Sequence, residues 1–337
     1  MSKFKINSIT DRSGYCGPVI SGVSTNNSTG CMIIPAGPTE HRGGRGRGVI
    51  GGGSLIPAGT AVNTLNLITI ATTGDAIDFG DLSYGGAYRG GLASSTRGIF
   101  ANASNDETYD YVTISSQGGA NDFGDAPTNH KGGATFNDSV RGYNAGGSDP
   151  SSTSNIRGMV IASTGSFYNA GDLTVVGLYM SGASSPTRAI SFGGAVPTTV
   201  KNIDVFTMAT GGSAIKFGEL ITARKYADTT SNTTRALAAG GEGPSANINS
   251  IEFVTIATDG NGTDFGDISS ATGVGKSGVV SSATRGIFAG FYPASGGGQR
   301  MDFVTITSAG NAQDFGDLTT TAYYPGGCSD SNGGLGE

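Results

Sequence analysis

Side chains that could act as acids, bases or activators of a nucleophile are few in this sequence. The only two histidines are His41 and His130, which lie far apart and in different local contexts. A serine or cysteine nucleophile needs a base positioned beside it, and neither histidine sits in a motif that would supply one. We therefore expect His130 in a surface loop. The glycine-rich run 43–53 lacks the Lys-Ser or Lys-Thr pair of a phosphate-binding loop.

Carboxylates are the second possible source of chemistry. Asp-Phe-Gly binds Mg²⁺ in protein kinases, but here it recurs without the catalytic loop, the strand lysine or a helical lobe. Residues 259–264 loosely resemble a calcium loop yet lack its spacing and final Glu, so a tight hairpin is the better interpretation. A pair of carboxylates that hydrolyses a glycosidic bond stays open as an alternative. The sequence favours a protein that is not an enzyme and that needs no metal or other cofactor.

The acids belong to a repeat. A version of Asp-Phe-Gly-Asp-Leu follows a short hydrophobic segment and a small turn six times. Successive central glycines are 44, 47, 47, 48 and 50 residues apart, a period typical of propellers, solenoids and arrays. The phenylalanine is kept in five copies, where we expect it to pack between sheets, and Ala170 replaces it in the third. That blade should pack differently, with Phe167 or Tyr168 compensating. The central glycines are Gly80, Gly124, Gly171, Gly218, Gly266 and Gly316.

An arginine is repeated equally often, before the second strand of each repeat. Equal numbers of arginines and of acids after the glycine predict six ion pairs between adjacent blades, since the guanidinium fork suits a carboxylate. The alternative is a ring of arginines around a channel that binds an anion. The arginines are Arg47, Arg97, Arg141, Arg188, Arg235 and Arg285. The acids are Asp81, Asp125, Asp172, Glu219, Asp267 and Asp317.

Each repeat contains four short strands and no helical periodicity. In residues 88–125, for example, the alternating and partly β-branched segment 109–114 is followed by a tight turn and a short last strand. Residues 316–334 align with 80–98, so the chain ends with the first strand of a blade whose other strands begin at Arg47. The sequence predicts an all-β, six-bladed β-propeller over residues 47–337, closed by pairing of the C-terminal strand with the N-terminal blade. Closure removes an open sheet edge.

The copies differ most in the loops between second and third strands, which span 53–64, 102–108, 144–155, 194–201, 241–249 and 291–299. In a propeller these loops share a face with the connections between blades. Aromatic rings among Ser, Asn and Gly suit binding of a sugar or a protein surface, although the tyrosines could equally just cap the blades. The candidate binding residues are Tyr84, Tyr88, His130, Tyr226 and Tyr292.

The composition of the chain limits the classes of partner to be expected. The chain has 337 residues, 59 glycines, no tryptophan and a formal charge of −6, so a broad nucleic-acid-binding surface is not expected. No apolar run reaches the roughly 18–20 residues that span a bilayer, and the first ten residues lack the apolar core of a signal peptide. Three cysteines without CxxC spacing predict reduced thiols rather than disulfides or a zinc site.

Residues 1–46 do not repeat and carry too few apolar residues for a core of their own, so we expect an extended arm that docks on another protein or trimerises with itself. The arm contains Lys-Ile-Asn-Ser-Ile, Asp-Arg-Ser-Gly, Ser-Gly-Val-Ser-Thr and Ile-Pro-Ala-Gly. It resembles the N-terminal leader of tail-fibre-like and other virion proteins of marine tailed phages, particularly cyanophages. The repeat Val-Thr-Ile-Ala-Thr…Asp-Phe-Gly-Asp-Leu is also similar to repeats in such phages. A weaker similarity links the Gly-Gly pairs to kelch propellers, whose Trp is absent.

The resemblance implies a virion structural protein, made in the host cytoplasm and located on the particle. Residues 1–46 would anchor it to other virion proteins, and the propeller would project as a tail-fibre-like adhesion module that contacts a host surface glycan or protein. Alternatives are a head or neck decoration protein without a receptor, a glycan hydrolase on a propeller scaffold, or a cellular kelch-like interaction protein.

Overall fold

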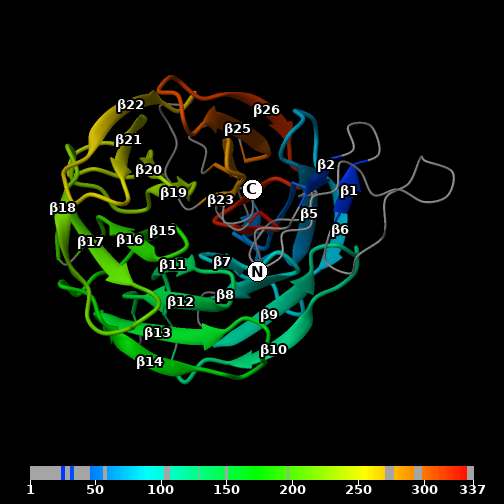
Figure 1. Cartoon of the computed structure of the whole chain (residues 1–337), viewed down its shortest axis with the longest axis horizontal. Coiled ribbons are helices and arrows are strands. Elements are labelled where there is room, and N and C mark those ends of the chain that lie inside the picture. Colours follow the sequence, from blue (N-terminus) through cyan, green and yellow to red (C-terminus); the bar gives the residue numbers. More distant parts are fainter. Residues whose placement is uncertain are drawn as a thin grey trace, which may run out of the picture.

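A computed structural model describes the backbone of 24–26 and 31–33, and the complete residues 46–55, 59–101, 107–128, 130–148, 151–195, 197–269, 277–291 and 298–331. Every element within these ranges is a β-strand. Six four-stranded antiparallel sheets stand around one axis (Figure 1). The all-β, six-bladed propeller is therefore confirmed. Of the predicted arm, the structure describes only Gly46 and the backbone of a hairpin, β1 (Ser24–Asn26) with β2 (Cys31–Ile33).

Each blade is a meander whose first strand lies innermost, where the first strands of neighbouring blades contact one another around the axis. Blade 1 comprises β28 (Gly326–Ser329), β3 (Arg47–Gly51), β5 (Thr64–Thr69) and β6 (Ile77–Asp81). Blade 2 comprises β7 (Gly90–Ala93), β8 (Arg97–Ala101), β9 (Thr108–Thr113) and β10 (Asn121–Asp125). Blade 3 comprises β11 (Ala134–Asn137), β12 (Arg141–Ala145), β13 (Asn155–Val160) and β14 (Tyr168–Asp172).

The remaining blades follow the same order. Blade 4 comprises β15 (Ser181–Ser184), β16 (Arg188–Phe192), β17 (Asn202–Thr207) and β18 (Ile215–Glu219). Blade 5 comprises β19 (Asp228–Ser231), β20 (Arg235–Ala239), β21 (Ser250–Thr255) and β22 (Thr263–Asp267). Blade 6 comprises β23 (Gly278–Ser281), β24 (Arg285–Ala289), β25 (Arg300–Thr305) and β26 (Gln313–Asp317). A small extra pair joins β27 (Ala322–Tyr323) to β4 (Ser54–Leu55).

The ring closes as predicted, because the last strand of the chain completes the first blade. Strand β28 pairs antiparallel with β3, with Gly326 opposite Gly51 and Ser329 opposite Gly48. The pairing continues past the strands: the Asp330 N–H donates to the Arg47 carbonyl at 3.1 Å, and the Arg47 N–H donates to Asp330 Oδ1 at 2.9 Å. Without β28 the inner edge of β3 would be unpaired.

The two ends of the disc differ. We call the end that carries the connections between blades the upper face and the other end the lower face. Isolated bridges join these connections to the loops after the second strands, as between Lys131 and Ser148 or Lys225 and Glu242. The expected sharing of one face by connections and variable loops is thus present. Arg47, at the start of a second strand, lies at the lower face.

The repeated Asp-Phe-Gly-Asp segment forms the fourth strand and joins each blade to the next. Phe79 is buried among residues of blades 1 and 2, and its carbonyl accepts the Gly118 N–H of blade 2 at 2.8 Å. Gly80 has a φ of +142°, and a Cβ there would clash with the Gly118 carbonyl oxygen. A glycine is therefore required at this bulge. The phenylalanines pack between sheets, as expected.

Candidate functional site

The six repeated arginines do cross between blades, but their partners are not the repeated acids. Arg97 Nη1 donates to the Ile161 carbonyl at 2.9 Å, and Arg235 Nη1 donates to the Ile306 carbonyl at 3.2 Å, each in the next blade. Arg47, Arg141, Arg188 and Arg285 bond to the carbonyls of Ile114, Ala209, Ile256 and Ile70 in the same way.

The predicted ion pairs between arginines and repeated acids are therefore wrong. The physical reason is strand direction: the arginine begins the second strand at the lower face, whereas the acid ends the fourth strand at the upper rim. The carboxylates that do pair with the repeated arginines are Asp138 with Arg141 and Asp259 with Arg188. The acids at the rim are exposed, except for the half-buried Asp267; they are Asp81, Asp125, Asp172, Glu219 and Asp317. The alternative anion-binding ring fails too, because the guanidinium groups reach carbonyls just after the neighbouring blade's third strand and not the axis.

A different set of polar side chains links the blades, and we call it the clasp. Asp110 on β9 is fully buried and accepts the Ser83 N–H at 3.0 Å and the Ser83 hydroxyl at 2.5 Å. Asp204 accepts the Thr174 N–H and hydroxyl at 2.9 and 2.6 Å. Five blades share this arrangement, with Asn66, Asp110, Asp204, Glu252 and Asp302 as the acceptors, each at most 4 % exposed. The clasp was not among the sequence-based predictions; its signal in the sequence is a recurring polar residue inside a hydrophobic third strand.

The upper mouth of the axis is filled by four tyrosines, which we call the tyrosine plug. Tyr88, Tyr179, Tyr226 and Tyr324 occupy equivalent positions in four connections and have φ values of 58–62°. Their rings stack in pairs, Tyr88 on Tyr324 with centroids 4.2 Å apart and Tyr179 on Tyr226 at 4.1 Å. Burial raises the pKa of the Tyr88 and Tyr226 hydroxyls. Left-handed backbone costs a bulky residue about 1–2 kcal/mol, so the stacked rings must offset strain at four places.

The tyrosine plug bears on whether the candidate tyrosines form a binding face or cap the blades. Tyr226 is buried at 8 % exposure and Tyr88 is half-buried against other rings, so these two close the channel instead of presenting a flat binding ring. His130 is not a surface residue either: it is 2 % exposed, and its Nδ1 lies 2.7 Å from the Gly146 carbonyl. Tyr84 is 51 % exposed and stays a candidate contact. Tyr292 lies outside the described residues.

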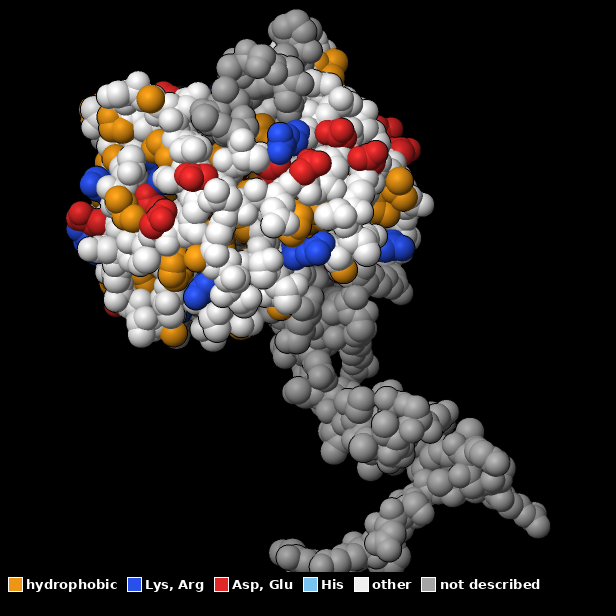
Figure 2. Space-filling model, turned by 90° about the horizontal axis from the view of Figure 1, so that it is seen from above, with side chains coloured by type: hydrophobic (Ala, Val, Ile, Leu, Met, Phe, Trp, Pro, Cys, Tyr) orange, Lys and Arg blue, Asp and Glu red, His pale blue; other side chains and the backbone are white. Residues whose placement is uncertain are grey.

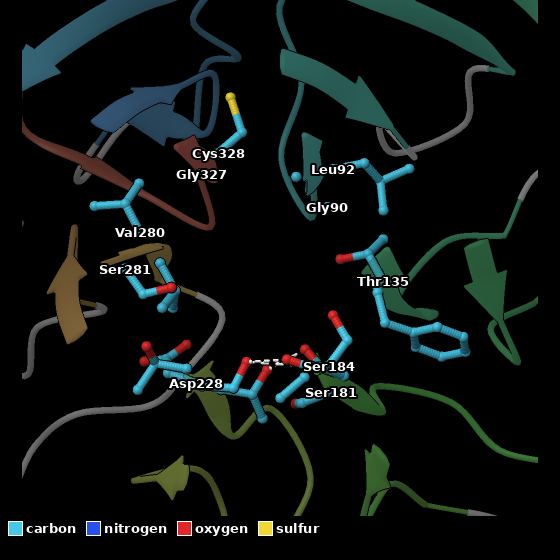
Figure 3. A pocket seen from close by; sticks show the side chains of 18 of the residues that line it. Gly90, Leu92, Thr135, Ser181, Ser184, Asp228, Val280, Ser281, Gly327 and Cys328 are labelled. Carbon is cyan, nitrogen blue, oxygen red and sulfur yellow. Dashed lines mark hydrogen bonds between the residues drawn. The ribbon is translucent and has the colours of Figure 1, made fainter. Parts of the chain in front are cut away.

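Below the plug, the inner strands surround a cavity of about 130 Å³ (Figure 3). Its wall is held by hydroxyls that bond to the neighbouring inner strand. Ser184 Oγ donates to the Asn137 carbonyl at 2.8 Å, and Ser231 Oγ donates to the Ser184 carbonyl at 2.7 Å. Ser329 Oγ donates likewise to the Ser281 carbonyl at 2.8 Å. These three serine hydroxyls thus serve the ring, and Cys328 nearby is a buried free thiol whose pKa burial raises.

Blade 3 departs from the repeat at several positions that lie together. Arg157 stands where the other blades have a clasp acceptor, Gly158 follows it, and Ala170 replaces the phenylalanine. A Cβ at Gly158 would clash with the Tyr168 ring, so Tyr168 covers Gly158. Phe167 does not; it packs against Tyr109 at 5.1 Å and Phe123 at 5.9 Å, on the side of blade 2.

These departures accompany a pocket of about 460 Å³ between blades 2 and 3, which we call the blade 3 pocket. Arg157 Nη1 donates to the carbonyl and the hydroxyl oxygen of Thr128, at 3.1 and 2.5 Å. The Thr128 hydroxyl lies 3.3 Å from His130 Nε2. The lining residues that the structure describes are Pro127, Thr128, His130, Thr153, Asn155, Arg157, Phe167, Tyr168 and Asn169.

Figure 2 shows one side of the disc, on which acidic, basic and hydrophobic side chains are scattered and no large patch of one kind stands out. Within the described ranges, no three His, Cys, Asp or Glu side chains are placed to hold a metal ion. No helix of the described chain is long and apolar enough to span a membrane.

Comparison with known proteins supports the fold alone. No protein-family model matches the sequence, and a search of curated proteins finds no match. Among solved structures, one titled "Structure of YjhT" superposes with a TM-score of 0.61. The match covers 72 % of this chain and 87 % of that one, at 11 % sequence identity. Such a likeness identifies a shared propeller architecture, which carries many unrelated functions.

Proposed function

We propose that this chain is a phage virion structural protein, in which residues 1–46 attach to the particle and the propeller projects as an adhesion module. The observation that carries the proposal is the placement of two features on opposite faces. Gly46 and Arg47, where the arm joins the ring, are at the lower face, whereas the loops that differ between blades are at the upper face. Attachment through the arm would leave those loops directed away from the particle.

The rest of the ring supports a scaffold role. The inter-blade arginines, the clasp acceptors and inner-strand hydroxyls such as that of Ser184 hold blades together, so many repeated polar groups have a structural purpose. Rigid scaffolds commonly present binding surfaces on variable loops, and here unlike loops lie on one face of a ring whose blade geometry repeats. The resemblance of residues 1–46 to phage leaders supplies the virion part of the proposal.

The test is to locate the chain and then remove its arm. Antibody raised against the ring should label purified phage particles in electron microscopy. A chain lacking residues 1–46 keeps every strand of the ring, so it should fold but fail to enter particles. Absence of label on particles would overturn the virion assignment, and normal incorporation of the shortened chain would overturn the arm's role.

Two further outcomes address the alternatives. Particles that lack the protein, because the shortened chain does not enter them, should adsorb poorly to host cells. Unchanged adsorption would favour a head or neck decoration protein over an adhesion module. Release of sugars from host glycan by the isolated ring would instead support a glycan hydrolase on this scaffold.

A further inference from the structure

The tyrosine plug brings together four phenol rings from four different connections between blades. Two of its contacts are face to face. Tyr88 stacks on Tyr324 with an interplanar angle of 20°, and Tyr179 stacks on Tyr226 with an angle of 27°. We propose that each stacked pair is a site of oxidative cross-linking, at which a one-electron oxidant joins the two rings as dityrosine. This inference does not rest on the proposed function of the chain.

The four tyrosines occupy a backbone position that favours a smaller residue. All four have left-handed φ values, which a bulky side chain rarely adopts. The connection between blades 2 and 3 has Gly132 at the equivalent place, with a φ of +71°. Glycine takes up this conformation without strain, so the turn itself needs no ring. The contacts between the rings are therefore what the four tyrosines contribute.

The stacked rings are close enough to react with each other. Their centroids are 4.2 Å apart in the pair of Tyr88 and Tyr324 and 4.1 Å apart in the other pair, closer than the roughly 4.5–7 Å usual for aromatic rings. The Tyr88 N–H donates to the Tyr324 carbonyl at 3.0 Å, which holds the first pair in place. The Tyr226 N–H donates to the Tyr179 carbonyl at the same distance. Between the two pairs the centroids are 6.0–6.3 Å apart, so a bond should form within a pair first.

The reaction balances with an external oxidant that accepts one electron at a time. Each phenol gives up one electron and its hydroxyl proton, which leaves a neutral tyrosyl radical. The two radicals combine at ring carbons beside the phenol oxygens, the Cε positions, and form one carbon–carbon bond. Each ring then transfers the hydrogen of that carbon to its oxygen, which restores the phenol. In total the pair loses two electrons and two protons, and the oxidant gains the two electrons.

Each pair contains one ring that an oxidant in solution can reach. Tyr88 and Tyr179 are half-buried at the upper mouth, whereas their partners Tyr226 and Tyr324 are at most 9 % exposed. The first electron can therefore leave from the half-buried ring, and the stacked partner is the nearest phenol with which the radical can combine.

A bond between Tyr88 and Tyr324 would close the ring covalently. Tyr324 lies two residues before β28, the strand that completes blade 1, and Tyr88 lies two residues before β7, the first strand of blade 2. The ring is otherwise closed by the pairing of β28 with β3. A cross-link that encloses most of the chain restricts the unfolded state strongly and so stabilises the fold.

The experiment oxidises the full chain in dilute solution with photoexcited tris(bipyridine)ruthenium(II) and persulfate. Dityrosine fluorescence should appear in the band of the single chain on a denaturing gel, and each cross-link should lower the mass by two hydrogens. Tandem mass spectrometry of tryptic peptides should locate the bonds within the two stacked pairs. Tyr88→Phe and Tyr324→Phe should each abolish the first cross-link and leave the second, because phenylalanine keeps a ring in the stack but has no phenol. Tyr84→Phe is the control: it removes an exposed tyrosine from the same tryptic peptide as Tyr88 and should leave both cross-links.

The consequence for ring closure is measured on the same samples. The cross-linked chain should unfold at a higher urea concentration than the untreated chain, and oxidised Tyr88→Phe should show a smaller increase. Absence of dityrosine within a single chain would overturn the proposal. So would cross-links as frequent between the two pairs as within them, or a fluorescence signal that Tyr84→Phe removes. An unchanged urea midpoint in the cross-linked chain would overturn its stabilising role.

Discussion

Asp110 on the third strand of blade 2 receives both the N–H and the hydroxyl of Ser83 from the connection that leaves blade 1. Neither residue belongs to the conspicuous Asp-Phe-Gly-Asp-Leu repeat, yet this bond recurs around the ring. Because the Asp110 carboxylate is fully buried, these two hydrogen bonds compensate for the loss of its hydration.

Removing this clasp should destabilise the ring. Asp110→Ala leaves the Ser83 N–H without its acceptor and should lower the free energy of unfolding by about 2–3 kcal/mol, the usual cost of a bond to a charged group. Asp110→Asn, the residue type found in the blade 1 clasp, should cost less. Urea denaturation measures both. Asp78→Ala, at an exposed position on β6, is the control and should change little; a loss equal to that of Asp110→Ala would contradict the clasp's role.

The bulge glycine can be tested with a matched pair. Gly80 and Gly74 have φ values of +142° and +156°, but a Cβ would clash with a neighbouring carbonyl only at Gly80, while Gly74 has open space. Gly80→Ala and Gly74→Ala therefore share a comparable backbone strain and differ in packing. We expect Gly80→Ala to be the more destabilising by about 1–3 kcal/mol, the usual cost of overpacking. Equal melting temperatures for the two variants would show that the inter-blade contact has no such effect.

The architecture of this chain was predictable because its signals are periodic. Six evenly spaced motifs and a split repeat leave few topologies, and the pairing of β28 with β3 followed from an alignment of the chain's two ends. Side-chain partners were not predictable in the same way. The repeated arginines, such as Arg97, and the repeated acids, such as Asp125, occur in equal numbers. Equal numbers do not show which end of a strand each residue occupies. The structure places them at opposite faces.

The departures of blade 3 were missed for a related reason. Arg157 and Pro127 are each unremarkable alone, and their joint departure becomes visible only when the Asp110–Ser83 pair defines what the other blades do at those positions. His130 was predicted as a binding residue on the surface, whereas it is buried, and its Nδ1 lies 2.7 Å from the Gly146 carbonyl. The sequence identified the connection that carries His130 but could not give the direction of its side chain.

Tyrosine ionisation predicts how stability depends on pH. Burial raises the pKa of Tyr109 from 10.0 to about 12. The unfolded chain then releases this proton at lower pH than the folded chain does, so the contribution is complete below pH 10 and is lost as pH rises towards 12. The loss should be about 1.4 kcal/mol per pH unit for this one proton. Tyr109→Phe should flatten the decline measured by urea denaturation between pH 10 and 12. An unchanged slope would mean that Tyr109 titrates normally.

Ring closure predicts the effect of shortening the C-terminus. Ending the chain at Pro325 removes β28, unpairs the inner edge of β3, and deletes Cys328 and Ser329 from the core and the inner wall. An exposed edge strand pairs readily with other chains. We expect this variant to melt at a lower temperature and to elute from a sizing column as oligomers or aggregate. Ending the chain at Ser331 keeps β28 and the bond between Asp330 and Arg47, so it should remain like the full chain. If both truncations stayed equally stable and equally sized, the C-terminal strand would not be what holds the ring closed.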